Sequence, residues 1–419
     1  MTLPHSASGK SERELALTLL SAHAVRERAH EMAALCEAGR LDHWRIDRGK
    51  LPATADYVVD TIRKNYPTLD IPFHARWRHF AAGGVDRWAA LEALRRWPDE
   101  ASLARAAFDL AIVSVLLDAG AGPDWRYRLE DGSSLARSEG LAVASLEMFA
   151  RGAFSADPRD KLRADASRLA AIDASDLADG FKVTARNPLV GLEGRAALLR
   201  ALGRAALDAP SIFGKMGAPR PGGLFDHLVD PRAKTVAIPA SAILEAVLTH
   251  LGPIWPSRLS LGGVGLGDCW RHPALRRPDA TDGLIPFHKL SQWLSYSLIE
   301  PLQWAGAKVT GIDALTGLPE YRNGGLFIDF GVLALQDPGE ASSPQEPASP
   351  LVVEWRALTV ALLDEIATLI RRTLRLDAAS LPLAKVLEGG TWAAGRRIAR
   401  EKRADGSPPL TIVSDGTVF

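Results

Sequence analysis

The sequence predicts a mainly α-helical protein with small β additions, and three observations support this fold class. Long segments carry apolar residues at spacings of three and four, which is the pattern of an amphipathic helix. Segments with strand character are few and short. The 419 residues are 47% hydrophobic and 24% charged, which is the composition of an ordinary globular protein with enough chain for a large core.

The helices are expected where such segments are bounded by capping and stop signals. Ser11 is suited to cap the first helix, Gly39 to end it, and Pro67 to end the second. A Gly-rich stretch follows the segment that ends at residue 122. We therefore predict helices over residues 11–39, 51–67, 86–97, 99–122, 138–154, 160–172, 192–207, 240–255, 282–306 and 351–376.

The strand signals are weaker. The best are "KTVAIP" (234–239), "GLFIDFGVLAL" (325–335) and "PLTIVS" (409–414), and "PDWRYRLEDG" (123–132) reads as a short extended turn. These segments are too few and too scattered for a large sheet. They are expected to be small additions to the helical body.

The organisation along the chain is expected to be one unit over residues 1–419, formed by two helical lobes at about 1–235 and 236–419. A Pro-, Ser- and Glu-rich segment at 336–350 predicts a flexible surface loop. The basic segment at 395–409 is interpreted as a solvated helix end and loop.

Composition excludes several function classes. Fifty Lys and Arg balance fifty Asp and Glu, which argues against a nucleic-acid binder but leaves room for a local basic pocket. Cys36 and Cys269, the two cysteines, are interpreted as buried thiols. The chain has no apolar run long enough for a membrane span and no signal-peptide pattern at its start, so a cytoplasmic protein is expected.

No metal or cofactor is indicated either. The ten histidines are scattered and no His-Glu-x-x-His or Cys-x-x-Cys spacing occurs. "GGVGLG" (262–267) lacks the Lys-Ser/Thr pair of a phosphate-binding P-loop, so we interpret it as an ordinary loop.

The segment 282–306 carries an unusual polar face. Apolar residues form one stripe of the predicted helix, and a second face carries Lys289, Gln292, Trp293 and Tyr296. Aromatic walls with a few directed polar groups are typical of a ligand pocket. An ordinary amphipathic helix is the alternative, and the pattern by itself does not decide between them.

The turn "TGLPEYRNGG" (316–325) places Glu320, Tyr321 and Arg322 in a row, a combination that a surface turn does not need. A carboxylate beside a sugar ring can stabilise an oxocarbenium-like centre or orient a water. An arginine can hold a phosphate or carboxylate, and a buried lysine such as Lys289 can keep the carboxylate ionised. The alternative is a salt bridge that pins the turn.

Four further carboxylates are open candidates for the same site: Asp109, Asp118, Glu139 and Glu354. Asp118 is the preferred one, with a helix-terminal hydrogen bond as its alternative role. Near Glu139, Ser138 is interpreted as a helix N-cap. Trp355, beside Glu354, is interpreted as a core tryptophan. His288, next to Lys289, completes the substrate-binding candidates.

Long motifs around these residues resemble one known family. The segments are "SVLLDAGAGPDWRY", "RSEGLAVASLEMFARGAFS", "LIPFHKLSQWLSYSLIEPL", "LTGLPEYRNGGLFIDFGVL" and the terminal "SDGTVF". They resemble the uracil catabolism protein 4 family over essentially the whole chain. The resemblance implies a step around ribosylurea, in a route that converts uracil to its nucleotide, opens the ring and releases urea.

The family is also distantly similar to queuosine salvage glycosidases. That similarity implies a helical DNA-glycosylase-like fold and cleavage of an N-glycosidic bond in a nucleoside 5′-monophosphate. Those enzymes carry a K-x-x-Q helix, matched here by Lys289 and Gln292, and an acidic-Tyr-Arg turn, matched from Glu320 to Arg322. Their acidic residue is Asp, so Glu320 is one methylene longer.

The resemblance implies residue roles in hydrolysis of ribosylurea or its 5′-phosphate. Glu320 would act on ribose C1′ and Lys289 would hold that carboxylate or a sugar hydroxyl. Arg322 would contact the carboxylate or a 5′-phosphate, and Tyr321 would face the leaving urea. Trp293 and Tyr296 would wall the pocket. The implied ligand is therefore a small nucleoside- or nucleotide-like molecule.

Two alternatives stay open. The first is an amidohydrolase that releases ammonia or carbamate from ribosylurea, chemistry that usually requires a metal or an activated Cys or Ser. The second is a non-catalytic partner that stabilises the ring-opening enzyme. Association with other enzymes of uracil catabolism is expected in either case.

Overall fold

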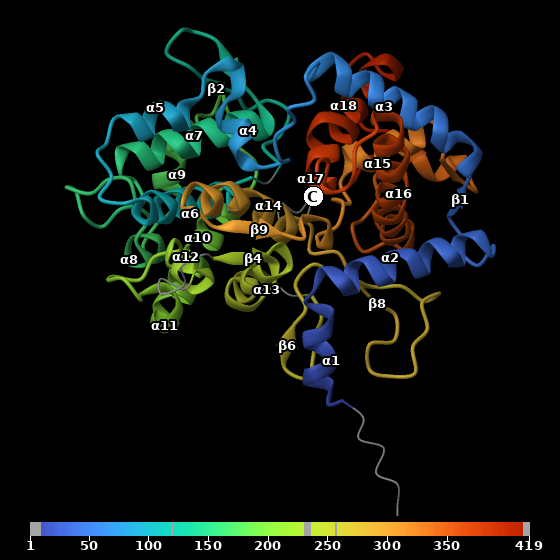
Figure 1. The fold of residues 1–419 in the computed structure, drawn as a ribbon, viewed down its shortest axis with the longest axis horizontal. Coiled ribbons are helices and arrows are strands. Elements are labelled where there is room, and N and C mark those ends of the chain that lie inside the picture. The colour runs from blue at the N-terminus through green and yellow to red at the C-terminus, as the bar shows by residue number, and fades with distance from the viewer. Residues whose placement is uncertain (1–9, 119, 230–235, 256–257, 414–419) are drawn as a thin grey trace, which may run out of the picture.

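The fold is mainly α with small β additions, as predicted (Figure 1). The computed structural model describes residues 10–118, 120–229, 236–255 and 258–413. The boundary expected near residue 235 and the terminal motif at 414–419 lie outside these residues, so the division into two lobes stays a prediction. The likeness to DNA glycosylases and the cytoplasmic location also stay predictions.

The first predicted helix is two helices, α1 (Glu12–Leu19) and α2 (Ala22–Glu37). Ser11 caps α1 as expected, with a capping box to Glu14. A second cap signal was missed, since the Ser21 hydroxyl accepts a hydrogen bond from the backbone N–H of Ala24. The chain therefore restarts its helix at residue 22 and turns there.

Of the remaining helices in the described residues, nine follow predicted segments, with ends that differ by several residues, and seven were not predicted, namely those over residues 76–80, 174–180, 210–213, 223–228, 321–329, 383–386 and 392–402. In chain order, the remaining helices are α3 (Leu51–Asn65), α4 (Arg76–Phe80), α5 (Arg87–Ala93), α6 (Glu100–Leu116), α7 (Arg137–Arg151), α8 (Ala166–Ala170), α9 (Ala174–Gly180), α10 (Leu192–Asp208), α11 (Pro210–Phe213), α12 (Gly223–Leu228), α13 (Ala240–His250), α14 (Lys289–Trp304), α15 (Tyr321–Asp329), α16 (Pro350–Leu374), α17 (Leu383–Val386) and α18 (Trp392–Lys402). A π-helical turn, Leu387–Thr391, joins the last two.

The strands form two-stranded pairs. The antiparallel pairs are β1 (Trp44–Ile46) with β10 (Leu333–Leu335), β2 (Tyr127–Arg128) with β3 (Ser134–Leu135), β5 (Ser260–Leu261) with β6 (Val264–Gly265), and β7 (Cys269–Arg271) with β8 (Leu284–Pro286). The parallel pair is β4 (Ala237–Pro239) with β9 (Lys308–Thr310). The predicted strand at 409–414 makes only an isolated bridge, from Ile412 to Gln345.

Two predicted boundaries around the site were wrong. Residues 325–329 belong to helix α15, and only residues 333–335 of the predicted strand 325–335 are extended. Helix α14 begins at Lys289 because residues 284–286 pair with β7 and His288 adopts a left-handed conformation (φ 49°). A residue before proline avoids the helical region, which favours strand pairing there.

The core is one large cluster that α6, α14 and α16 cross. Figure 1 shows α4 to α10 gathered on one side, α3, α15, α16 and α18 on the other, and α14 between them. Trp355 is buried in α16 as expected, and both cysteines are buried thiols, as predicted. Burial raises the pKa of Cys36 to about 11 and that of Cys269 to about 12.

The segment 336–350, predicted to be a flexible loop, contains the helical turn η5 (Pro338–Ser342). Asp337 caps this turn through the backbone N–H of Gly339. In the part of the chain that the structure describes, none of the helices has the length and apolar character that a bilayer span requires.

Candidate functional site

Glu320 is the N-cap of α15, and this role fixes its carboxylate. One carboxylate oxygen accepts the backbone N–H of Arg322 at 2.8 Å and the other accepts that of Asn323 at 2.6 Å. The side chain is 7% exposed and forms no ion pair within the described residues. The salt bridge considered as an alternative role is therefore not found, and a helix cap holds the carboxylate instead.

Lys289 carries the positive charge that acts on Glu320. It opens α14, and its backbone N–H donates to the Asp268 carboxylate at 3.0 Å. Its ammonium group makes no contact with a partner in the described ranges. Burial lowers the pKa of Lys289, while Glu320 is the strongest charge acting to raise it.

Burial also raises the pKa of the Glu320 carboxyl group above its usual range. The two backbone N–H groups and the charges of Lys289 and His74 act in the opposite direction. A carboxyl group with a raised pKa beside a lysine with a lowered pKa is typical of a functional site rather than of a structural pair. His74 was not among the sequence-based candidates.

Tyr321 and Arg322 follow on the first turn of α15. The Arg322 guanidinium lies 5.0 Å from the centre of the Tyr321 ring and donates to the Gly406 carbonyl at 2.9 Å. Burial raises the pKa of Tyr321, and Glu320 adds to this effect, so the phenol stays protonated. α18 can approach because Gly395 has no side chain where a Cβ would lie 2.2 Å from the Arg322 carbonyl oxygen.

Gln292 and Tyr296 hold the turn in place. The Gln292 amide oxygen accepts the backbone N–H of Thr316 at 2.8 Å, and its nitrogen donates to the Thr316 hydroxyl at 2.5 Å. The Tyr296 hydroxyl donates to the Thr316 carbonyl at 2.8 Å. These contacts tie α14 to the segment that carries Glu320, and the substrate-binding role expected for both residues stays a prediction.

Trp293 belongs to a cluster of aromatic and basic side chains between α4, α14 and α18. Its ring centre lies 5.6 Å from that of His79 and 6.5 Å from that of His74. The Arg76 guanidinium lies 5.5 Å from the same ring. Buried Trp293 Nε1 and His79 Nδ1 have no hydrogen-bond partner among the described residues. Burial, with a contribution from Arg76, lowers the pKa of His79 to about 4.

His74 is oriented by a carboxylate. Its Nδ1 lies 2.7 Å from Glu388, and its ring packs 5.6 Å from the ring of Trp392. Glu388 lies in the π-helical turn before α18, a feature that occurs frequently at functional sites. A carboxylate at Nδ1 fixes the tautomer and leaves Nε2 for another partner. Nε2 has no hydrogen bond within the described residues.

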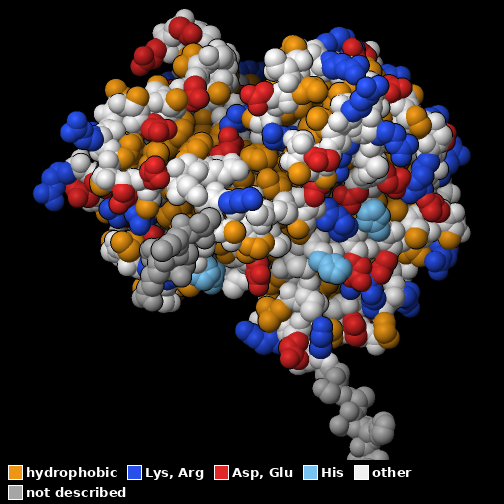
Figure 2. Space-filling view, in the orientation of Figure 1, with side chains coloured by type: hydrophobic (Ala, Val, Ile, Leu, Met, Phe, Trp, Pro, Cys, Tyr) orange, Lys and Arg blue, Asp and Glu red, His pale blue; other side chains and the backbone are white. Residues whose placement is uncertain are grey.

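A cavity of about 590 Å³ adjoins these groups. Figure 2 shows the surface indented between the two groups of helices, with hydrophobic side chains visible in the indentation. The cavity lining includes His79, Arg322, Glu388 and Trp392, together with arginines from α4, α7 and α18. This volume suits a small ligand.

Asp118 follows the C-terminal end of α6 and lies close to the site. It pairs with the Arg76 guanidinium at 3.0 Å and accepts the Ser138 hydroxyl at 3.1 Å. The N-cap interpretation of Ser138 was wrong, because α7 begins at Arg137 after Ala136 and Ser138 bonds to Asp118 instead. Asp118 also acts to raise the pKa of Lys289.

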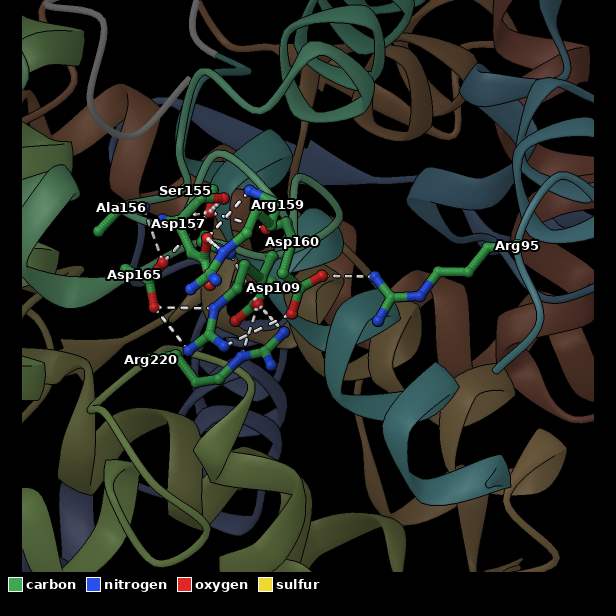
Figure 3. Close-up of polar contacts among 11 residues, drawn as sticks. Arg95, Asp109, Ser155, Ala156, Asp157, Arg159, Asp160, Asp165 and Arg220 are labelled. Atoms are coloured by element: carbon green, nitrogen blue, oxygen red, sulfur yellow. Dashed lines mark hydrogen bonds and ion pairs between the residues drawn. The ribbon is translucent and has the colours of Figure 1, made fainter. Parts of the chain in front are cut away.

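Glu139 lines the cavity, whereas Asp109 and Glu354 do not. Glu139 pairs with Arg396 at 2.8 Å. Glu354 is buried against His272, 3.1 Å away, and accepts the backbone N–H of His43. Asp109 lies in a separate network with Arg220 (Figure 3).

His288 lies on another side of α14. Its Nε2 is 2.9 Å from the Leu19 carbonyl, and it lines a second cavity of about 440 Å³ together with the glycine-rich loop 262–267. The loop interpretation of that segment holds, since Gly262 and Gly263 turn the chain between β5 and β6. The substrate-binding role expected for His288 stays a prediction.

Sequence reasoning missed the second half of the site: His74, His79, Glu388, Trp392, Arg396 and Arg400. One signal was available for His74. The segment "IPFHARW" (71–77) repeats the start of "IPFHKLSQW" (285–293), which carries Lys289. The basic segment from residue 395, interpreted as solvated, packs as α18 against α15 and turns arginines into the cavity. In the described residues, no group of three or more side chains forms a metal-binding cluster.

Comparison with known proteins places the chain in context. A family model described as "Protein of unknown function (DUF1688)" matches residues 18–419. The chain is 39% identical over 416 residues to "Protein urg3" of Schizosaccharomyces pombe, covering 97% of this chain and 99% of that protein. It is 39% identical over 415 residues to "Uracil catabolism protein 4" of Lachancea kluyveri, covering 91% and 93%. The resemblance stated from the motifs is confirmed.

Proposed function

The chain belongs to the family of DUF1688 proteins, and on that premise we propose that it acts in uracil catabolism by hydrolysing the N-glycosidic bond of ribosylurea or its 5′-phosphate. The products are urea and ribose or ribose 5-phosphate. The name of the relative from Lachancea kluyveri supports the pathway. One observation carries the reaction type: Glu320 is a buried, rigidly held carboxylate with no ion pair within the described residues, beside an equally unpaired Lys289.

Cleavage of the N-glycosidic bond requires a carboxylate of this kind. Breaking the bond between a urea nitrogen and ribose C1′ builds positive charge on the sugar. A carboxylate that is already fixed and desolvated stabilises that charge without reorganising. The two backbone N–H groups hold Glu320 in one orientation and leave further lone pairs on its oxygens.

The step balances as a hydrolysis. A water oxygen forms a bond to C1′ while the C1′–N bond breaks and its electron pair stays on the urea nitrogen. Glu320 takes the proton of the water, and a protonated group of the site gives one to the urea nitrogen. Lys289 keeps Glu320 ionised until the water is deprotonated.

His74 is better suited than Tyr321 to give that proton. Glu388, 2.7 Å from Nδ1, orients the imidazole so that Nε2 is left for another partner. Burial raises the pKa of Tyr321, which makes the phenol a hydrogen-bond donor rather than a proton donor. Association with other enzymes of uracil catabolism is part of the same proposal.

Product analysis tests the proposal. We expect the protein to release urea from ribosylurea or its 5′-phosphate, with ribose or ribose 5-phosphate as the co-product in mass spectra. Glu320→Gln is expected to abolish release. Glu354→Gln, a matched change at a buried carboxylate outside the site, is expected to keep it in the folded protein.

Other outcomes would contradict the proposal. Ammonia or carbamate in place of urea would identify an amidohydrolase. No turnover of either compound would favour the non-catalytic partner. Urea release that survives Glu320→Gln would remove the carboxylate from the mechanism.

A further inference from the structure

The cavity lined by Arg322, two residues after Glu320, carries an excess of positive charge. Five arginines line it, Arg78, Arg137, Arg322, Arg396 and Arg400, against three carboxylates, Glu139, Glu388 and Asp405. The arginines come from α4, α7, α15 and α18, which lie far apart in sequence. Since the whole chain has a net charge of zero, this excess is a local feature.

Ion pairs do not neutralise the excess. Arg78 pairs with Glu300 at 2.7 Å and Arg396 with Glu139 at 2.8 Å. Glu388 is engaged by His74. Within the described residues, Arg137 and Arg400 form no ion pair or hydrogen bond of their side chains. Two cations therefore face the cavity with no counterion.

Arg322 is the buried member of the group. It is 5% exposed, and its guanidinium donates a hydrogen bond to a neutral acceptor, the carbonyl of Gly406. Burial lowers its pKa, and the nearby charges of Arg137 and Arg396 add to this effect. The guanidinium groups of Arg137 and Arg396 thus lie within electrostatic reach of Arg322, an arrangement that an anion between them would stabilise.

The backbone at Arg137 supports the same interpretation. Arg137 has φ 51°, a left-handed conformation that is unfavourable for a residue other than glycine. It opens α7, a helix of 15 residues whose N-cap, Ala136, provides no capping side chain. The strained turn brings its guanidinium, and the uncapped first turn, to the cavity.

The cluster also lies next to the reacting carboxylate. Arg322 is two residues from Glu320, and Arg137 lies close enough to Tyr321 to act to lower its pKa. An anionic group held here would be near the sugar whose C1′ faces Glu320. A 5′-phosphate is the anion that such a ribosyl substrate carries on the far side of its ring.

We propose that Arg137, Arg322 and Arg396, with the exposed Arg400, form a phosphomonoester site, so that the substrate class is the 5′-phosphorylated ribosyl compound rather than the free riboside. This inference rests on the proposed function for the identity of the sugar. The binding site itself rests on the cavity, on the strained start of α7, and on Arg137, Arg322 and Arg400, which form no ion pair within the described residues. Arginine suits the task because its planar fork of donors matches phosphate oxygens.

Calorimetric titration with ribose 5-phosphate and with ribose tests the site without turnover. We expect ribose 5-phosphate to bind and ribose to bind about tenfold to a hundredfold more weakly. Arg137→Ala is expected to weaken ribose 5-phosphate by a similar factor and ribose by less than about threefold. The matched control is Arg276→Ala, an exposed arginine outside the cavity, which is expected to change neither affinity. Equal binding of the two sugars, or an equal loss of both in Arg137→Ala, would overturn the proposal.

The same variants separate this inference from the proposed function. With ribosylurea and its 5′-phosphate as substrates, we expect Arg137→Ala to lower kcat/KM for the phosphate far more than for the free riboside. If the arginines bind ribose 5-phosphate but neither compound releases urea, the site stands and the hydrolysis fails. If both compounds are hydrolysed with equal kcat/KM, the hydrolysis stands and the phosphate site fails.

Discussion

Asp109 and Glu320 are both buried carboxylates, and burial raises the pKa of each, yet their surroundings differ. Asp109, on α6, is in direct contact with the Arg220 guanidinium and accepts backbone N–H groups from Ala164 and Gly222. Around it, further Asp–Arg pairs extend to Arg95 (Figure 3). Glu320 accepts two backbone N–H groups and touches no cation among the described residues.

The difference lies in pairing rather than in burial. A buried carboxylate with a guanidinium in contact is compensated, and removing either partner leaves an isolated charge in the core. A buried carboxylate that faces a lysine without touching it retains lone pairs for a ligand and responds to charge that develops nearby. The first arrangement holds helices together, and the second is suited to chemistry.

The most severe test of this contrast is Glu320→Gln. We expect kcat/KM for urea release to fall by about 10³-fold, because the transition state loses its fixed charge. The free energy of unfolding should change by about 1 kcal/mol or less, because only one of two cap hydrogen bonds is lost. Steady-state kinetics and urea denaturation measure the two effects. Glu320→Asp, which keeps the charge, should retain more activity, and equal losses in both variants would contradict a role for the charge.

Asp109→Asn should show the opposite pattern. The free energy of unfolding is expected to fall by about 3–5 kcal/mol, because Arg220 would stay buried without its counterion. The kcat/KM of the folded fraction should be unchanged. Chemical denaturation combined with active-site titration would show this. A stable variant with low activity would place Asp109 in the mechanism and contradict its assignment as a structural carboxylate.

Lys289→Met tests the charge that faces Glu320. Ionised Glu320 is the active form, and burial raises its pKa, so activity is expected to decline on acidification from a pH above the usual glutamate range. Lys289 acts to lower that pKa, so its removal should move the acidic limb of the kcat/KM profile to higher pH. Activity at neutral pH should fall by about 10²-fold. An acidic limb that stays in place would show that Lys289 does not act on Glu320.

Gln292→Met separates positioning from substrate contact. The change leaves the buried backbone N–H and hydroxyl of Thr316 without their partner. We expect the free energy of unfolding to fall by about 1–3 kcal/mol, with KM nearly unchanged and kcat lowered modestly. A large rise in KM at unchanged stability would instead make Gln292 a substrate ligand. Thermal denaturation and a KM-against-kcat comparison decide between them.

The smallest effect is expected for Tyr321→Phe. If His74 gives the proton to the leaving urea, loss of the phenol hydroxyl removes one hydrogen bond and lowers kcat by about tenfold or less. His74→Gln in the same assay should cost more, because a general acid contributes about 10²-fold or more. A larger loss in Tyr321→Phe than in His74→Gln would return the donor role to Tyr321.

Much of the fold could be predicted from local sequence patterns, and the errors in the predicted boundaries have physical causes. The predicted helix ends were wrong where a second capping signal was overlooked. Ser21 is an example, because it caps α2 after the turn that ends α1. The segment 325–335 looked extended because its apolar residues are adjacent, but the cap at Glu320 starts a helix instead. Residues 284–286 were predicted to be helical but form a strand, because they pair with β7, which ends 13 residues earlier in the sequence.

About half of the candidate site was predictable in the same way. Lys289, Glu320 and Arg322 lie in two motifs close together in sequence, and their unusual composition singled them out. His74, Glu388 and the arginines of α18 come from segments that show no such pattern. The proximity of His74 and Glu388, 314 residues apart, could not be inferred from either neighbourhood.

The sequence by itself determined the helical class, the family and the pair of motifs that carry Glu320 and Lys289, because periodicity, capping and composition are local properties of the chain. Only the tertiary structure decided which charges are paired. Asp109 contacts Arg220 in the core, whereas Glu320 caps a helix N-terminus and lies within electrostatic reach of Lys289, which forms no ion pair within the described residues. Pairing depends on distances across the fold, and those distances distinguish a structural carboxylate from one that can act on a substrate.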